Sequence, residues 1–337
     1  MKYIAMTLLC SLLQGADPGK LFEACEHPGT PGAGVMVIQA GKVVYKHAFG
    51  LSDLEKQTRA TTKTNYRLAS VTKQFTAMSI MLLAEKGQLT FDQKLNTILT
   101  GLPAGITIRQ LLNHTSGLPD YEDGATTFPL KDKDVLEILR KKNRTEFEPG
   151  AKFSYSNSGY AVLAMVVEKV SGMPFAAFLE KNIFGPLKMT ATVAHQEGID
   201  KVRERAYGHS PDGASFKRTD QSLTSAVLGD GGIYSSVEDL RKWDAALWSS
   251  HKLVSAKTWQ QAVTPGPNAG IYGFGWESTS YKGHKVWQHG GSTIGFRTFI
   301  ARFPEDRMTV IVLLNRSDLD SKKLAMSVAD LYLAASK

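Results

Sequence analysis

Ser70 and Lys73 stand three residues apart, directly ahead of a run of apolar residues. If that run is a helix that begins near Ser70, the two side chains lie on one face of its first turn. A serine hydroxyl becomes a nucleophile when a neighbouring base removes its proton, and a partly buried amine can be that base. The pair therefore predicts acyl transfer through a serine. The alternative is a helix-capping serine beside an exposed lysine.

Two further motifs could complete such a site. Tyr155 and Asn157 lie in a turn ahead of a predicted helix, and a phenol beside an ammonium can pass on a proton. His289 is followed by Gly290 and Gly291, and two glycines let a ligand or a second backbone come close. Each motif also has a structural explanation: a core tyrosine beside a capping asparagine, and a hairpin turn with an exposed histidine.

Strand patterns lie near both ends of the chain, and helical patterns lie between them. The β-rich stretches, which predict two hairpins, are residues 35–39 with 43–45 and residues 298–303 with 309–314. We therefore expect an α+β fold, in which an antiparallel sheet from residues 30–75 and 228–337 is flanked by helices. Residues 76–227 would form an inserted all-helical region. A cleft between the two parts is the natural place for the site.

Turn and cap signals predict the remaining elements. The predicted helices are residues 75–87, 107–112, 131–142, 158–170, 175–182 and 321–333. Ser235 and Glu238 have the spacing of a capping box for one more helix, which ends near Trp248. Residues 274–276 and 285–287 predict additional strands.

The bulk composition is typical of a globular protein. The chain has 337 residues, of which 42% are hydrophobic and 21% charged, so it can bury a large core. The net charge is +8, but the basic residues are dispersed apart from residues 140–144, and nucleic-acid binding is not indicated. The two cysteines predict neither a disulfide framework nor a metal site, and we expect no metal or cofactor. A second serine–lysine pair, Ser249 and Lys252, lies in a polar stretch and is expected at the surface.

The first residues have the pattern of an export signal. An apolar run at residues 3–13 follows Lys2 and is too short to span a bilayer. We expect residues 1–16 to be a signal peptide and the protein to be secreted or periplasmic. The alternative is an uncleaved, buried N-terminal helix in a cytoplasmic protein. A lipoprotein anchor at Cys10 is less favoured, because a bulky leucine precedes it.

The three motifs in this order resemble the penicillin-recognising serine hydrolases. Within that group the sequence looks like the branch that holds class C β-lactamases, D-alanyl-D-alanine carboxypeptidases, D-aminopeptidases and related esterases. Residues 111–119, 149–157 and 231–235 look like further landmarks of the branch. The resemblance covers roughly residues 30–335 and implies a β-lactamase/transpeptidase-like fold.

The resemblance also implies a role for each motif. Ser70 would be acylated, while Lys73 and Tyr155 would share the proton transfers. The oxyanion hole would consist of the backbone N–H groups of Ser70 and Ser292. The substrate-binding positions would be Asn157, His289, Gly290, Gly291 and Ser292.

Two departures from the β-lactamase pattern bear on the substrate. The lysine of Lys-Thr-Gly is replaced by His289, a residue type that is largely neutral at pH 7. The threonine hydroxyl, which would bind a substrate carboxylate, is absent because Gly290 takes its place. Both changes favour an esterase or a D-peptidase over an efficient β-lactamase, although carboxypeptidases of the branch can carry histidine at the first position.

We therefore expect a metal-free serine hydrolase whose partner is a small molecule or peptide. The substrate would be a small ester, a D-amino-acid peptide or a β-lactam amide. The alternatives are a true class C-like β-lactamase and a catalytically silent penicillin-binding or ligand-binding protein on the same scaffold. Neither Gly-x-Ser-x-Gly nor His-Glu-x-x-His occurs in the chain, which disfavours an α/β-hydrolase or a zincin.

Overall fold

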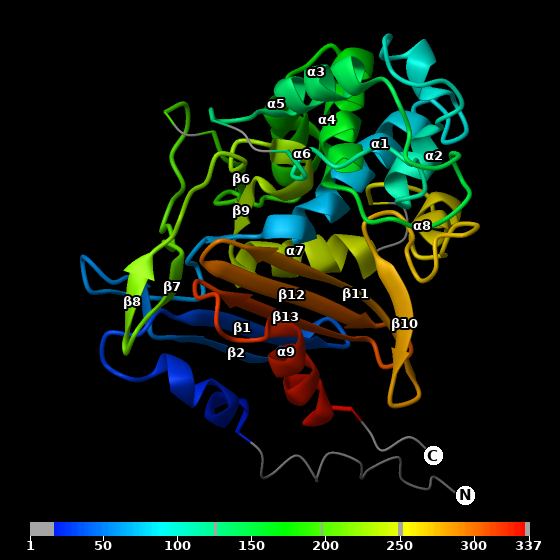
Figure 1. Cartoon of the computed structure of the whole chain (residues 1–337). Helices are drawn as coiled ribbons and strands as arrows, with labels where there is room; N and C mark the ends of the chain where they lie inside the picture. The colour runs from blue at the N-terminus through cyan, green and yellow to red at the C-terminus, as the bar shows by residue number, and fades with distance from the viewer. Residues whose placement is uncertain (1–16, 125–126, 197, 249–251, 334–337) are drawn as a thin grey trace, which may run out of the picture.

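The two ends of the chain meet in one antiparallel sheet (Figure 1). The computed structural model describes residues 17–333 except 125–126, 197 and 249–251, so the predicted signal peptide, Cys10 and Ser249 lie outside the described residues. In spatial order the strands are β10 (Glu277–Tyr281), β11 (His284–Thr293), β12 (Phe296–Phe303), β13 (Met308–Leu314), β1 (Ala33–Gln39) and β2 (Lys42–Phe49). The two predicted hairpins are β1–β2 and β12–β13, and β1 pairs with β13. The predicted fold class is confirmed.

Both faces of the central strands are buried. Side chains alternate across a strand, so Val35, Phe299 and Val312 point to one face, where η1 (Pro18–Cys25) and α9 (Ser321–Asp330) pack. Met36 and Ile311 point to the other face, into the core shared with the helical part of the molecule. The sheet is therefore a rigid middle layer, which can hold a site at the end of its strands.

The helical part surrounds α1 (Lys73–Glu85), whose residues 73–83 are all buried. The other helices are α2 (Ile108–Leu112), α3 (Asp132–Lys142), α4 (Asn157–Ser171), α5 (Phe175–Leu179), α6 (Leu228–Gly231), α7 (Val237–Trp248) and α8 (Ala256–Ala262), with short helical turns η2 (Ala69–Thr72), η3 (Leu95–Thr97) and η4 (Glu180–Phe184). Thr107 forms the capping box that starts α2, and Gly172, at φ +69°, ends α4. The predicted helices in this region are therefore present.

The inserted region is not all-helical, contrary to the prediction. It contains β6 (Val193–Ala194), which joins β5 (Tyr66–Arg67) and β9 (Ile233–Ser235) in a small sheet. It also contains a hairpin, β7 (His209–Asp212) with β8 (Ser215–Arg218), while β3 (Leu51–Asp53) and β4 (Thr58–Arg59) pair elsewhere. Strands of two to four residues are too short to show an alternating pattern in the sequence.

Three local predictions were wrong. Ser235 belongs to β9, and the α7 cap is Ser236, whose Oγ accepts a hydrogen bond from the Asp239 N–H at 3.2 Å. Residues 274–276 form no strand, because Gly275 has φ +73° and packs against the Lys73 carbonyl; β10 begins at Glu277. The C-terminal helix is shorter than the predicted 321–333, since α9 ends at Asp330.

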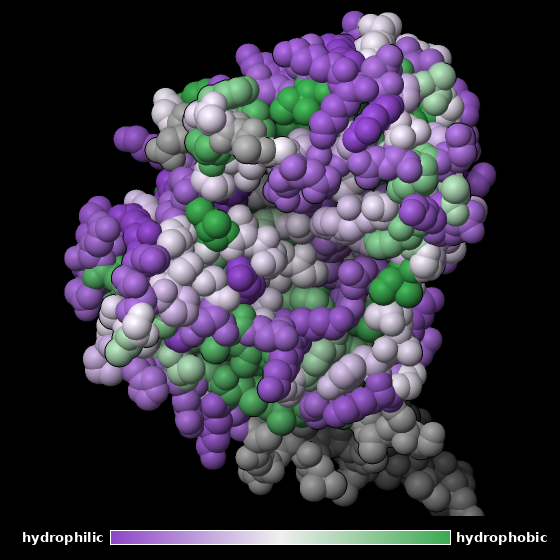
Figure 2. All heavy atoms as spheres, viewed as in Figure 1, coloured by the Kyte–Doolittle hydropathy of each residue, from purple (hydrophilic) through white to green (hydrophobic). Residues whose placement is uncertain are grey.

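The described residues contain neither a single helix that could span a membrane nor a cluster of metal ligands. The face seen in Figure 2 is mostly hydrophilic or of intermediate hydropathy, with apolar residues in small groups. Among the described residues no single helix is long and apolar enough to cross a membrane; α4 and the following α5–η4 segment, bent by 74°, meet that test only as a pair. In the same part of the chain no group of three or more His, Cys, Asp or Glu side chains is placed to hold a metal ion.

Candidate active site

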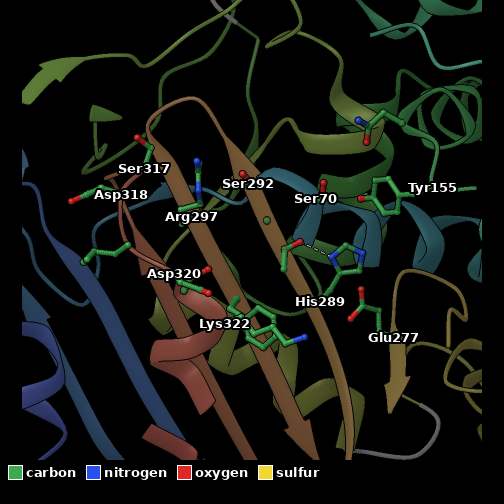
Figure 3. Close-up of a pocket in the computed structure, with 16 residues that line it drawn as sticks. Ser70, Tyr155, Glu277, His289, Ser292, Arg297, Ser317, Asp318, Asp320 and Lys322 are labelled. Atoms are coloured by element: carbon green, nitrogen blue, oxygen red, sulfur yellow. Dashed lines mark hydrogen bonds between the residues drawn. The ribbon is translucent and has the colours of Figure 1, made fainter. Parts of the chain in front are cut away.

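The three sequence motifs meet at one cavity. It has a volume of about 680 Å³ and lies between the helical part and the end of β11. Figure 3 shows Ser70 and Tyr155 on one side of this space and His289 and Ser292 on the other. The motif residues that line it are Ser70, Tyr155, Asn157, His289, Gly290, Gly291 and Ser292. Lys73 is not among the residues that line the cavity, but its Nζ contacts Ser70 Oγ.

Ser70 and Lys73 are in hydrogen-bond contact. Lys73 Nζ lies 3.2 Å from Ser70 Oγ, 2.7 Å from Asn157 Oδ1 and 3.0 Å from the Asp230 carbonyl oxygen. The Lys73 side chain is 0% exposed, and Ser70 makes no cap, since it lies in η2 and the N-cap position of α1 is Thr72. The alternative of a capping serine beside an exposed lysine is therefore wrong.

The surroundings of Lys73 suit a proton acceptor. Asn157 Oδ1 and the Asp230 carbonyl can only accept hydrogen bonds. A charged Lys73 donates one hydrogen to each of these two oxygens and one to Ser70. A neutral Lys73 still satisfies the two oxygens with its two hydrogens and turns its lone pair toward the Ser70 hydroxyl. The same contacts thus accommodate both states that proton transfer requires.

The turn that carries Ser70 is held in an uncommon backbone conformation. Ala69 has φ +48°, a region that costs a non-glycine residue of order 1–3 kcal/mol and persists only where the surroundings enforce it. The preceding carbonyl, of Leu68, accepts a hydrogen bond from Thr298 Oγ1 on β12 at 2.7 Å. The sheet therefore helps to hold Ser70 in place.

The two glycines of β11 have different functions. A Cβ on Gly291 would come under 3.0 Å from both the Leu68 carbonyl oxygen and Thr298 Oγ1. Only glycine lets β11 pack directly against the turn that carries Ser70. A Cβ on Gly290 would first meet the Phe299 ring at 3.3 Å. Gly290 therefore leaves the cavity open but is not required by the backbone packing.

The end of β11 forms an edge that faces the cavity. The pairing of β10 with β11 stops at Glu277 and Gln288, and from His289 to Thr293 β11 pairs with β12 only. The expected oxyanion donors, the N–H groups of Ser70 and Ser292, belong to the two segments that line the cavity here. A substrate carbonyl between them would meet N–H groups from both sides.

Tyr155 lies across the cavity from the helix start. Its side chain is 41% exposed, and its hydroxyl points toward Ser70 in Figure 3. Lys73 Nζ lies 4.9 Å from the centre of its ring. The Tyr155 ring also packs on His114, with ring centres 4.3 Å apart, and His114 Nδ1 accepts a hydrogen bond from the Ser156 N–H at 3.1 Å. Burial, followed by the nearby Lys73 charge, holds the pKa of His114 well below its usual range, so this histidine is a neutral support.

His289 is buried, so the alternative of an exposed turn histidine is wrong. Its side chain is 3% exposed. The Gly290 carbonyl, 2.7 Å from Nδ1, can only accept, so Nδ1 carries the proton and Nε2 accepts from the Tyr272 hydroxyl at 2.7 Å. Burial and then the Lys73 charge lower the pKa of His289 to about 3. His289 is therefore neutral at pH 7 and contributes no positive charge to the cavity.

A loop that the sequence analysis did not use fixes Asn157. Asn157 Nδ2 donates to Glu122 Oε2 at 2.9 Å, and its backbone N–H donates to Asp120 Oδ2 at 2.6 Å. With Oδ1 held by Lys73, the orientation of the amide is determined. Sequence reasoning missed Glu122, Asp120 and Asp230 because their positions depend on how distant loops dock. The sequence pointed to these three acids only indirectly, because residues 111–119 and 231–235, which resemble landmarks of the β-lactamase-related branch, lie next to them in the chain.

The fold and the arrangement of the motifs fit one class of protein, the β-lactamase-related serine hydrolases. The family model for Beta-lactamase matches residues 20–333, so the chain belongs to that family. It is 33% identical over 308 residues to Penicillin-binding protein 4* of Bacillus subtilis, a match that covers 84% of this chain and 68% of the relative. Protein flp of Staphylococcus aureus is 28% identical over 306 residues; the match covers 85% of this chain but only 59% of flp.

Solved structures show the same fold. A penicillin-binding protein from Bacillus halodurans superimposes with a TM-score of 0.83 at 26% identity, covering 95% of this chain and 100% of that chain. D-amino acid amidase from Ochrobactrum anthropi SV3 has a TM-score of 0.78 at 22% identity, with 93% and 94% covered. The second likeness concerns the fold alone.

Proposed function

We propose that this protein is a serine hydrolase that forms an acyl-enzyme on Ser70. The observation that carries the proposal is the 3.2 Å contact between Ser70 Oγ and a fully buried Lys73 Nζ, whose other contacts are acceptors. Membership of the Beta-lactamase family supports the same chemistry. A silent ligand-binding protein would not need an amine held in this position.

In the acylation step, Ser70 Oγ attacks the substrate carbonyl carbon while its proton passes to Lys73. The N–H groups of Ser70 and Ser292 stabilise the negative charge that develops on the carbonyl oxygen. Tyr155, whose hydroxyl points into the same space, delivers a proton to the leaving group. Asn157 Nδ2 has a second hydrogen beyond the one given to Glu122, and this hydrogen can hold a substrate carbonyl.

The proposed substrates are small esters and D-amino-acid peptides, ahead of β-lactams. At His289 the cavity offers a neutral ring, and at Gly290 it offers no hydroxyl, so these two positions give a substrate carboxylate little to bind. An ester or a peptide amide needs neither group for attack at its carbonyl. The expected export signal at residues 1–16 would place this activity outside the cytoplasm, in a secreted or periplasmic protein.

Active-site labelling tests the proposal. The protein is incubated with a fluorophosphonate and with a fluorescent penicillin, and the adduct is mapped by mass spectrometry. We expect one adduct, on Ser70, that is absent in Ser70→Ala and retained in Ser317→Ala, which alters another serine of the same cavity. Label on another residue, or label that survives Ser70→Ala, would refute the assignment. Turnover of p-nitrophenyl esters, D-Ala-D-Ala peptides and a chromogenic cephalosporin, measured side by side, then ranks the substrates.

A further inference from the structure

A second, smaller cavity adjoins Ser70. It has a volume of about 80 Å³ and is lined by Ser70, Asn157, Glu122, Asp230 and Arg67 among others. The space is too small for a substrate but large enough for a few water molecules, which need such polar partners. Arg67 is nine-tenths buried or more, and its Nη1 has no hydrogen-bond partner among the described residues. A buried donor without a protein partner indicates ordered water nearby.

Asp230 is the most buried acid of this cavity, with 6% of its surface exposed. Its carbonyl oxygen holds Lys73, and the next residue, Gly231, lies against the backbone of Ala69. Its carboxylate is oriented by the Tyr121 hydroxyl, which donates to Oδ2 at 2.7 Å. Within the part of the chain that the structure describes, no group donates a hydrogen bond to Oδ1. Asp230 therefore keeps one carboxylate oxygen without a protein donor among the described residues, in a residue that lines the same cavity as Ser70.

We propose that Asp230 is the general base for the water that hydrolyses the acyl-enzyme, an inference that rests on the proposed function. The water oxygen forms a bond to the acyl carbon while one of its protons passes to Asp230 Oδ1. The bond between that carbon and Ser70 Oγ then breaks. Lys73 or Tyr155 gives a proton to Oγ as the acid product leaves. The proton held by Asp230 then passes through the water of the cavity to Lys73 or Tyr155, which restores the starting state of the enzyme. Acylation and deacylation thus use different bases.

The charges around Asp230 suit this role. Burial raises its pKa to about 6, although the Lys73 ammonium and the Tyr121 hydrogen bond lower it, Glu122 raises it and Arg67 lowers it. Asp132, on the neighbouring α3, is the other buried acid coupled to it. A base with a pKa near 6 is mostly ionised at pH 7 and still accepts a proton readily.

The test separates the two half-reactions. With a p-nitrophenyl ester, rapid mixing measures acylation as a burst of p-nitrophenol, and the steady state measures deacylation. In Asp230→Asn we expect the burst to persist while the steady-state rate falls about 100-fold or more, and mass spectrometry should find the acyl group retained on Ser70. The matched control is Asp132→Asn, a buried acid outside the cavity that accepts hydrogen bonds from the Leu228 and Gly229 N–H groups. It should leave the ratio of the two rates unchanged.

If Asp230→Asn fails to fold, the milder variant Tyr121→Phe still tests the proposal. Loss of the Tyr121 hydrogen bond raises the pKa of Asp230, so the pH profile of deacylation should move to higher pH while that of acylation stays in place. Wild-type deacylation in Asp230→Asn, an equal loss of both steps, or a deacylation defect only in Glu122→Gln would overturn the inference. If wild-type protein shows no acyl group on Ser70, the proposed function itself fails.

Discussion

Substitution of Gly291 by alanine should damage both the fold and the site. The new Cβ would come under 3.0 Å from the Leu68 carbonyl oxygen and from Thr298 Oγ1, a separation that real Cβ atoms essentially never show. The strand and the turn that carries Ser70 must move apart, because neither contact is the flexible end of a long side chain. Overpacking of this kind costs about 1–3 kcal/mol, and a displacement of about 1 Å at a reacting group costs about 100-fold in rate.

The adjacent Gly290 supplies the matched control. Its Cβ would meet the Phe299 ring at 3.3 Å, a contact that a small shift of the ring relieves. We expect Gly290→Ala to unfold within about 0.5 kcal/mol of wild type and to keep turnover of a small neutral ester. Denaturant unfolding and kcat/KM for a p-nitrophenyl ester, measured on both variants, check the prediction. Equal losses in the two variants, or a Gly291→Ala protein with wild-type stability and activity, would refute the packing argument.

Three further outcomes follow from contacts near the sheet and the site. Thr298→Val removes the hydrogen bond to the Leu68 carbonyl. It should lower the free energy of unfolding by about 1–2 kcal/mol, measured by chemical denaturation, and should lower kcat for an ester. A variant with wild-type stability and wild-type kcat would contradict this prediction. Arg302→Met leaves the buried Asp244 without its 2.8 Å ion-pair partner and should lower stability by about 3–5 kcal/mol, whereas a wild-type melting curve would show that the pair is dispensable. Burial raises the pKa of Asp132 to about 7, so the folded state favours the protonated acid; its contribution to stability is full below about pH 4 and is lost as the pH rises to about 7. The free energy of unfolding of wild type, measured relative to that of Asp132→Asn, should fall as the pH rises through this range. A difference between the two proteins that does not change with pH would contradict the prediction.

The sequence was sufficient to predict which motifs meet. Each of the three motifs, at Ser70, Tyr155 and His289, is a weak signal alone. Each lies at the boundary of a helix or strand, and boundaries marked by glycine, proline or capping residues can be predicted from sequence. The two hairpins could be predicted because β1, β12 and β13 are long runs of β-forming residues. The joining of β1 to β13 followed from having strands at both ends of one chain.

The contacts that hold the site residues in place could not be predicted from the sequence. His114, Tyr121 and Asp230 act through contacts with residues far away in the chain, such as the Tyr121–Asp230 hydrogen bond. No local pattern encodes such a contact, because it depends on the docking of loops whose course is set by the whole core. For the same reason the pairing of β5 with β9 was missed, although it fixes the segment just before Ser70.

The pairing of β1 with β13 has a consequence for how the protein matures. The site needs Ser70 from the first quarter of the chain and β11 from the last, and the sheet that joins them stays open until β13 has been made. The proposed hydrolytic activity can therefore arise only after β13 has been synthesised and has joined β1. A fluorophosphonate that marks Ser70 would accordingly report the closure of this sheet, and a pulse-chase experiment could time that closure.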